Sequence, residues 1–386
     1  MLNKKGTITQ ELALLKGQAG SHSPSIKTIQ KAIPKLNINI DACFLSNPYA
    51  TEIFMKDLSD VLSDRETIKD IIEYYPSQNS ALANIFAEFY GINPSQLIVG
   101  NGAIELIEYA MKIFINNKVA ITLPTFSPYY ESIDSKTSVS YFFLRKTENY
   151  QLNLKEFSDF IKRERCDSAI LINPGNPTGQ YIHYQDVVQF INDNSHLKSI
   201  VIDESFIHFA YEDQEYCSMI SYYELIKQCP SLILIKSMSK DFGIAGLRVG
   251  YMVASEDRIS KMLQGGFLWN SNGFAEYFIR KYVEPTFQAR YAQARLRHIR
   301  ETISFGQKLA QLEGFHFVPA RSNFFLLEVL NRSSIDVFEY LLVKHGIYVR
   351  DCSDKRGLEG NYIRVASRTE KENDRIISGL RKSMAG

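Results

Sequence analysis

The chain has 386 residues, with 44 lysines and arginines against 43 aspartates and glutamates, and a formal net charge of +1. This balance of charge argues against nucleic acid or an anionic membrane as a partner, so we expect the partners to be small molecules. The length suits one large and one small domain and allows a deeply buried site.

The N-terminal segment, MLNKKGTITQELALLKG, has no continuous apolar run, and no stretch of the chain approaches the length that crosses a bilayer. The five cysteines are odd in number and form no Cys-x-x-Cys pair, which argues against a disulfide framework or a zinc site. We therefore expect a cytoplasmic protein without a metal. Residues 1–55 are interpreted as an N-terminal arm that joins part of the small domain.

Residues 56–285 are predicted to form the large domain. From about residue 80, short apolar runs alternate with amphipathic stretches, which is typical of strands and helices that build a parallel sheet. The runs end at or next to Gly100, Pro124, Asn173, Asp203, Lys236 and Ser255. The segments after the first five runs are GNGAIEL, PTFSPYY, NPGNPTG, DESFIHF and SMSK. Because ligands bind outside the carboxyl ends of such strands, these segments predict one shared crevice.

Two of these segments suit a phosphate group. Gly102 and Ala103 stand at the start of a predicted helix, where free backbone amides and the positive end of the helix dipole bind anions. Ser237, Ser239 and Arg248 add two hydroxyls and a permanent cation. Glycines also serve ordinary turns, so the first segment alone is a weak signal.

Four further residues suit a pyridine aldehyde when they are taken together. Lys240 offers an amine near the phosphate-binding residues, and Asp203, after a buried strand, would pair with a pyridinium nitrogen. Asn176 offers an amide donor to a phenolate oxygen, and Phe126 could lie on an aromatic ring. Taken singly, each has an ordinary explanation: a surface lysine, a paired carboxylate, an Asn-Pro turn and a core phenylalanine.

Residues 286–386 are predicted to form a smaller α+β domain. A helical stretch carries arginines at positions 290, 295, 297 and 300, and two further helices alternate with apolar runs. The neutral overall charge favours a solvated helix face over a nucleic-acid surface for these arginines.

The order of these motifs resembles the fold-type I pyridoxal-phosphate enzymes of the class I/II aminotransferase superfamily. The shared motifs are G-x-G-A-x-E-L, P-T-[FY], N-P-x-N-P-T-G, D-E-x-[FY], and S-x-S-K with an arginine eight residues later, and the likeness runs from about residue 45 to the end. It implies an α/β fold with a mostly parallel, seven-stranded sheet between helices and a smaller α+β C-terminal domain. It also implies the cofactor pyridoxal 5'-phosphate.

The resemblance assigns a role to each crevice residue. Lys240 would bind the cofactor aldehyde, Asp203 would pair with the ring nitrogen, Asn176 would contact the ring oxygen and Phe126 would stack on the ring. The cofactor phosphate would be held by Ser237, Ser239, Arg248 and the amides of Gly102 and Ala103. Tyr75, in EYYPSQN, matches a family tyrosine that reaches this phosphate across a homodimer, which implies composite active sites.

Within the superfamily, the chain is most similar to the branch of histidinol-phosphate aminotransferases and threonine-phosphate decarboxylases. The segment IYVRDCSDKRGLEGNYIRVASRT resembles the decarboxylase group, which favours R-x-C-S-x-x-x-G-L followed by R-V-A-x-R-T, whereas related aminotransferases tend to carry R-V-T-x-G-T. By that likeness Arg364 would bind the carboxylate of a small phosphorylated amino acid and Arg350 its phosphate. For both arginines, an exposed strand end with a surface ion pair is the ordinary alternative.

The sequence departs from the family pattern at two places that bear on the reaction. Phe206 stands where most aminotransferases have a tyrosine, which again favours the decarboxylase group. The N-terminal His-Gly-Gly segment of the family is absent, and His22 is only a loose substitute for it.

We therefore expect decarboxylation of O-phospho-L-serine or O-phospho-L-threonine to ethanolamine phosphate or aminopropanol phosphate. Two alternatives stay open: an aminotransferase that acts on a phosphorylated substrate such as histidinol phosphate, and a regulator that keeps the fold without turnover. No basic extension accompanies the domain, which argues against the second alternative.

Overall fold

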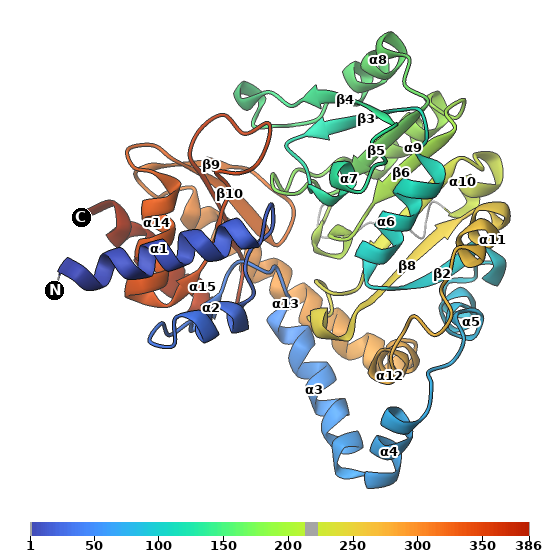
Figure 1. Cartoon of the computed structure of the whole chain (residues 1–386), viewed down its shortest axis with the longest axis horizontal. Coiled ribbons are helices and arrows are strands. Elements are labelled where there is room, and N and C mark those ends of the chain that lie inside the picture. The colour runs from blue at the N-terminus through green and yellow to red at the C-terminus, as the bar shows by residue number, and fades with distance from the viewer. Residues whose placement is uncertain (1, 213–222, 386) are drawn as a thin grey trace.

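The computed structural model describes residues 2–212 and 223–385, and its largest element is a seven-stranded sheet (Figure 1). The strand order is β2-β8-β7-β6-β5-β3-β4, and β8 is the one strand that runs antiparallel to the others. The strands are β2 (Leu97–Asn101), β3 (Lys118–Leu123), β4 (Ser138–Phe143), β5 (Ser168–Ile172), β6 (Ser199–Asp203), β7 (Leu232–Ser237) and β8 (Val249–Ala254). The expected mostly parallel sheet is confirmed.

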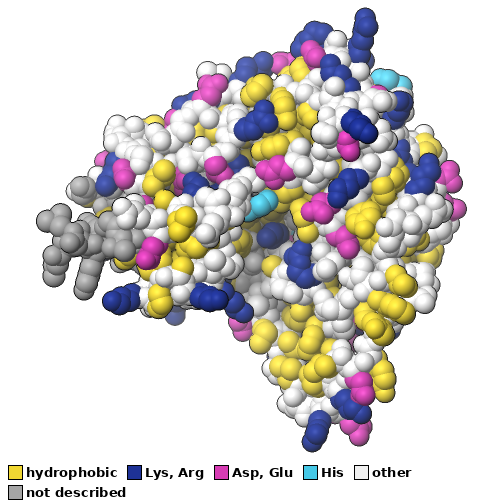
Figure 2. Space-filling model, viewed as in Figure 1, with side chains coloured by type: hydrophobic (Ala, Val, Ile, Leu, Met, Phe, Trp, Pro, Cys, Tyr) yellow, Lys and Arg dark blue, Asp and Glu magenta, His cyan; other side chains and the backbone are white. Residues whose placement is uncertain are grey.

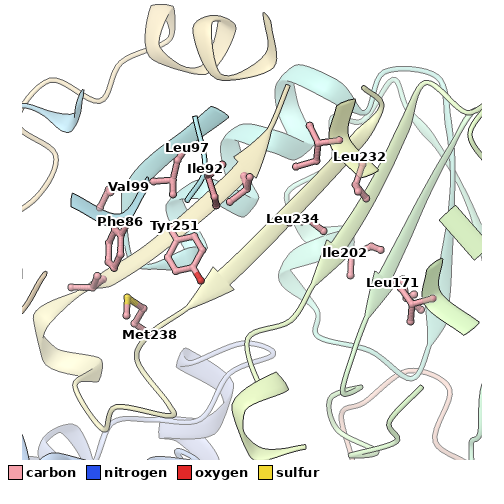
Figure 3. Close-up of a cluster of buried hydrophobic side chains, with 14 of the residues drawn as sticks. Phe86, Ile92, Leu97, Val99, Leu171, Ile202, Leu232, Leu234, Met238 and Tyr251 are labelled. Carbon is pink, nitrogen blue, oxygen red and sulfur yellow. The ribbon is translucent and has the colours of Figure 1, made fainter. Parts of the chain in front are cut away.

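Helices cover both faces of this sheet, because its strands are apolar on both sides. On β2, Leu97 and Val99 face one core, which Figure 3 shows, and Ile98 faces the other. The first core includes residues of α5 (Asn79–Tyr90), α8 (Leu154–Glu164), α9 (Tyr184–Asp193), α10 (Tyr223–Gln228) and α12 (Gly273–Tyr282). The second includes residues of α6 (Ala103–Phe114), α7 (Pro128–Glu131) and α11 (Glu256–Gln264).

A smaller antiparallel sheet lies beside the large domain, in the order β12-β13-β10-β9. Its strands are β9 (Phe315–Val318), β10 (Phe324–Val329), β12 (Arg350–Asp351) and β13 (Tyr362–Ala366). It shares a core with α13 (Pro285–Leu309), α14 (Ser334–His345) and α15 (Glu370–Ala385). The expected smaller C-terminal domain with both helices and strands is confirmed.

The N-terminal segment packs on this smaller domain. β1 (Ile40–Asp41) pairs in parallel with β11 (Ile347–Tyr348), and α1 (Leu2–Gln18) and α2 (Ile26–Ala32) share an apolar cluster with α14. Lys16 near the end of α1 forms a salt bridge with Asp351 of β12. The arm is therefore held both by apolar packing and by charge.

Helix α3 (Pro48–Ser63) packs against α13, and α4 (Arg65–Glu73) follows it at the lower end of the view in Figure 1. The side chain of Asn47 caps α3 by accepting from the amide of Tyr49 at 3.0 Å, and Pro48 occupies the first turn, where no amide is required. The long helix α13 supplies Phe287 to the core of the large sheet and Phe305 to that of the small sheet. The domain boundaries at residues 55/56 and 285/286 stay predictions.

The expectation of a solvated arginine face on α13 is wrong for Arg295. This side chain is 6% exposed and donates to the backbone oxygens of His208 and Ala210, next to the short helix η3 (Ile207–Phe209). It is buried because α13 passes directly against the loop that follows β6. Arg290 and Arg297 do lie near the surface, where they pair with Asp57 and Glu301.

Four cysteines are free and buried: Cys43, Cys166, Cys229 and Cys352. Cys217, also counted in the sequence argument, lies outside the described residues. Within the described ranges, we find no helix with the length and apolar character needed to cross a membrane.

Candidate active site

A cavity of about 410 Å³ opens between the two domains at the carboxyl ends of the large-sheet strands. In Figure 2 the molecule is hollowed between its two parts, and lysine and arginine side chains are visible inside the hollow. The structure brings together around this cavity the predicted residues Ala103, Phe126, Asn176, Asp203, Ser237, Ser239, Lys240, Arg248, Arg350 and Arg364. The five segments that follow the predicted strands therefore converge as their order along the chain suggested.

One side of the cavity is suited to an anion. Helix α6 begins after Gly102 without a side-chain cap, which leaves amides of its first turn for an anion. The predicted phosphate contact of the Gly102 amide does not fit this geometry, since that amide already donates to the Gly100 and Arg248 oxygens at 2.8 and 2.9 Å. Gly102 has φ +74°, and a β-carbon at this position would clash with Arg248 Nη2. Arg248 itself has φ +62°. Its guanidinium lies at the helix start, where Nη2 donates to the oxygen of Asn101 at 3.4 Å. Ser237 and Ser239, both buried, complete this side.

Asp203, the last residue of β6, lines the cavity and is 3% exposed. It accepts hydrogen bonds from the Tyr129 hydroxyl and the Ser205 amide, both at 2.8 Å. Burial raises the pKa of this carboxyl, against the opposing effect of Ser205 and Tyr129. A cationic N–H from a ligand would stabilise the buried carboxylate.

Lys240 reaches the cavity from the loop after β7, and its Nζ donates to the Phe44 oxygen at 3.2 Å. Burial, followed by the nearby positive charge of Arg364, lowers the pKa of this amine to about 8. A lysine with such a pKa is partly neutral near pH 7, which is the form that attacks an aldehyde.

Arg364 of β13 is fixed between the two domains. Its Nη1 donates to Asn176 Oδ1 at 2.6 Å, and its Nη2 donates to the Cys43 oxygen at 2.9 Å. Its guanidinium carbon lies 5.3 Å from the ring centroid of Phe324. Within the described part of the chain its buried Nε has no hydrogen-bond partner. The guanidinium is therefore positioned to take an oxyanion in the cavity.

Arg350 of β12 is 6% exposed and bonds through Nη2 to Asp354 Oδ2 at 2.6 Å and to the Ser21 oxygen at 2.9 Å. Lys355 donates to the same Ser21 oxygen at 3.0 Å. The N-terminal arm thus contributes one wall of the cavity, and the Ser21 hydroxyl also lies 2.8 Å from that of Ser127 in the large domain.

The two residues at which the sequence departs from the family pattern both border the cavity. Phe206 is buried with its ring against Phe324, at 5.1 Å between centroids, so it offers no hydroxyl to a ligand. His22 approaches Phe126 edge-on, with 6.3 Å between ring centroids. The histidine is exposed and comes from the loop after α1.

Tyr75 does not border the cavity of its own chain. Its side chain is 77% exposed and stacks on Trp269, with 4.5 Å between ring centroids. Hydrophobic side chains gather over α3 and α4 at the lower end of the view in Figure 2. Ile72, Tyr74 and Leu268 are exposed beside this pair in the sequence.

Three residues of the site were not identified from the sequence. Tyr129 stands in PTFSPYY three residues after Phe126, and one turn of α7 brings its hydroxyl to Asp203. Ser205 stands two residues after Asp203, and its amide donates a hydrogen bond to that carboxylate. Lys355 lies in the loop after Arg350, where a surface lysine would be the ordinary interpretation. Of these, only Tyr129 had a sequence signal, its place beside the predicted ring-stacking residue.

The model of the family "Aminotransferase class I and II" matches residues 44–380. The chain belongs to this family. Its relatives include the L-serine phosphate decarboxylase of Campylobacter jejuni, 48% identical over 374 residues (97% of this chain and 96% of the relative). The L-serine phosphate decarboxylase of Sulfurospirillum multivorans is 40% identical over 382 residues, 98% of this chain and 97% of the relative.

A solved structure of a decarboxylase from Sulfurospirillum multivorans superposes on this class I/II chain with a TM-score of 0.92. The two are 39% identical, and the match covers 98% of this chain and 97% of the other. The predicted membership of the aminotransferase class I/II family and the likeness to the phosphate decarboxylases are confirmed by these matches.

Proposed function

We propose that the chain is a pyridoxal-phosphate enzyme that decarboxylates a phosphorylated hydroxy amino acid, O-phospho-L-serine or O-phospho-L-threonine. The observation that carries this proposal is identity of 48% and 40%, over nearly the full length, to two L-serine phosphate decarboxylases. The cavity supports it, since Arg350 and Arg364 offer separate sites for the two oxyanions of such a substrate. The proposed location is the cytoplasm, where free cysteines such as Cys43 and Cys352 persist.

The residues present fit pyridoxal phosphate. The α6 N-terminus, Ser237, Ser239 and Arg248 would hold its phosphate, because a helix start and a permanent cation together suit a dianion. The buried carboxylate of Asp203 suits its ring nitrogen in the protonated form. When bound through Lys240, the cofactor supplies an electron sink for the pair left by departing carbon dioxide.

Asn176 would join the cofactor site to the substrate site. Since its Oδ1 accepts from Arg364, its Nδ2 is left to donate to the ring oxygen. Phe126 would lie against the ring face, with His22 at its edge. Phe206 offers no donor, so the ring oxygen would lack the hydrogen bond that a tyrosine at this position would give.

The chain's own residues would then orient and protonate the substrate. Arg350 would hold the phosphate end, so that binding energy far from the α-carbon helps to orient the carboxylate that leaves. Arg364, which lies between the two domains, would bind that carboxylate. The amine of Lys240, released when the substrate amine replaces it, would carry a proton to the α-carbon, and the lowered pKa of Lys240 suits this transfer near neutral pH.

The proposal is tested by product analysis. The enzyme is incubated with pyridoxal phosphate and O-phospho-L-serine, O-phospho-L-threonine or histidinol phosphate, each with and without 2-oxoglutarate, while phosphorus resonances and carbon dioxide are followed. We expect ethanolamine phosphate, or its methylated homologue, without a keto acid. Glutamate formed from 2-oxoglutarate, with no carbon dioxide from any substrate, would establish the aminotransferase alternative instead.

A further inference from the structure

We propose that Lys355 binds the phosphate of the substrate together with Arg350 and determines the preference of the site for phosphorylated substrates. This inference rests on the proposed function and extends it to a residue that the family motifs do not mark. Lys355 lines the same cavity as Arg350, five residues further along the chain.

The first observation is the shared hydrogen-bond acceptor. Lys355 Nζ and Arg350 Nη2 both donate to the Ser21 oxygen, at 3.0 and 2.9 Å. Two cations therefore converge on one neutral oxygen. Burial and then the charge of Arg350 lower the pKa of Lys355, which reflects this crowding. An ammonium group has three N–H donors, so two remain for a ligand after the bond to Ser21.

The second observation is the balance of charge. The described residues that line the cavity include five cations, namely Lys240, Arg248, Arg350, Lys355 and Arg364, and one carboxylate, Asp203. In the proposed function Lys240 binds the cofactor aldehyde, Arg248 faces the cofactor phosphate and Arg364 faces the substrate carboxylate. Arg350 and Lys355 then remain for the substrate phosphate.

Arg350 alone would not balance that phosphate. Its guanidinium already pairs with Asp354 at 2.6 Å, so the pair has no net charge. A phosphate monoester carries about −1.5 to −2 charges near pH 7. Lys355 supplies the positive charge that the pair of Arg350 and Asp354 lacks, and its compact ammonium suits a phosphate oxygen.

The third observation is how the Lys355 loop is held. The Arg356 guanidinium lies 4.4 Å from the ring centroid of Tyr141 and 5.5 Å from that of Tyr130, and it donates to the Tyr141 hydroxyl at 3.2 Å. Gly357 has φ +87°, and a β-carbon there would lie 2.9 Å from backbone atoms of Leu123 and the following proline. This loop of the small domain is thus seated on the large domain, which fixes Lys355 over the cavity.

The test measures the binding of a phosphate monoester without turnover. Phosphoethanolamine and ethanolamine are titrated into the holoenzyme by calorimetry, for the wild type, Lys355→Met, Lys355→Gln and Lys355→Arg. We expect both neutral variants to bind phosphoethanolamine about 10- to 100-fold more weakly, the loss of one hydrogen bond between charged groups, and Lys355→Arg to keep most of the affinity. Ethanolamine binding should not change. Lys371→Met, at an exposed lysine of α15, is the matched control and should bind as the wild type.

The possible results distinguish a failure of the role of Lys355 from a failure of the proposed function. Folded Lys355→Met and Lys355→Gln proteins with unchanged affinity for phosphoethanolamine would overturn the role of Lys355 and leave the proposed function intact. Equal loss in Lys355→Arg, accompanied by a lower Tm, would also overturn it, since that pattern indicates a structural role. A wild-type holoenzyme that binds phosphoethanolamine no better than ethanolamine would overturn both the inference and the choice of a phosphorylated substrate.

Discussion

Lys240 and Asp203 are both shifted toward their uncharged forms by the same cause, the loss of water in a buried cavity. The pKa of Lys240 falls to about 8 and that of Asp203 rises. Neighbours modify each shift: Arg364 lowers the pKa of Lys240 further, whereas Tyr129 and Ser205 keep Asp203 available as a carboxylate. The site therefore favours a neutral amine on Lys240 and a carboxylate on Asp203 that can pair with a cationic group of a ligand.

The shifted pKa of Lys240 predicts how the apoprotein takes up its cofactor. Because only the neutral amine attacks an aldehyde, the rate of pyridoxal-phosphate attachment should rise with pH and level off above about 8, well below the 10.5 of an ordinary lysine. Arg364→Met removes a positive charge near Lys240. Because this removal stabilises the protonated amine, the pKa of Lys240 should rise and the plateau should move to higher pH. Stopped-flow absorbance measures both profiles.

Arg364→Lys is the matched control, because it retains the charge and should retain the profile. Borohydride reduction should fix the cofactor to the peptide that contains Ser237 and Arg248, and Lys240→Ala should abolish this label. Labelling of another peptide, or a rate that keeps rising to pH 10 in the wild type, would contradict the assignment of Lys240.

At the residue scale, the sequence predicted side chains that belong to motifs and missed those that act through the fold. Lys240 and Asp203 stand in short patterns whose chemistry can be read directly. Lys355 reaches the cavity only because Arg356 and Gly357 seat its loop on the large domain. Such a long-range contact leaves no local pattern in the sequence.

At the scale of elements, apolar runs predicted six strands of the large sheet but did not locate β4. Its segment, Ser138–Phe143, forms the edge of the sheet and is only partly buried, so it lacks a continuous apolar run. The reversed direction of β8 also has no signature in its own residues. The convergence of the loops was predictable because it follows from parallel strands alone.

The proposed binding of the cofactor phosphate at the N-terminus of α6 can be tested with a substitution of Gly102. Gly102 has φ +74°, and Gly102→Ala would drive a methyl group into the Arg248 guanidinium. We expect the affinity of the apoprotein for pyridoxal phosphate to fall about 10- to 100-fold, the loss of one hydrogen bond to a charged group. The affinity for pyridoxal, which has no phosphate, should change little. Fluorescence titration of both ligands measures the difference.

Gly91→Ala separates the loss of the phosphate contact from backbone strain. Gly91 ends α5 with φ +67° and has nothing within 4 Å of an added β-carbon, so this variant carries a similar strain without the clash. It should bind both ligands as the wild type does. Equal weakening of pyridoxal and pyridoxal phosphate in Gly102→Ala would show that the helix start does not hold the phosphate.

At the scale of the whole molecule, the cavity is closed by three parts of the chain. The large domain supplies Asp203 and Lys240, the small domain supplies Arg350 and Arg364, and the N-terminal arm supplies the Ser21 oxygen. The predicted contribution of Tyr75 would add a fourth part, from a second copy of the chain. Its exposure of 77% and its stacking on Trp269 place an aromatic pair at the surface, where a partner could cover it.

Mixing two variants that are each expected to be impaired tests the composite homodimer. Lys240→Ala removes the amine that binds the cofactor, and Tyr75→Ala removes a side chain that is predicted to serve the partner's site. In a mixed dimer, one site carries both substitutions and the other carries neither. When equal amounts of the two variants exchange subunits at random, about half of the dimers are mixed, and each mixed dimer has one intact site. About a quarter of all sites should therefore be active, measured as carbon dioxide released from O-phospho-L-serine. Activity equal only to the sum of the unmixed variants, in samples shown by native mass spectrometry to contain mixed dimers, would place Tyr75 outside the partner's site.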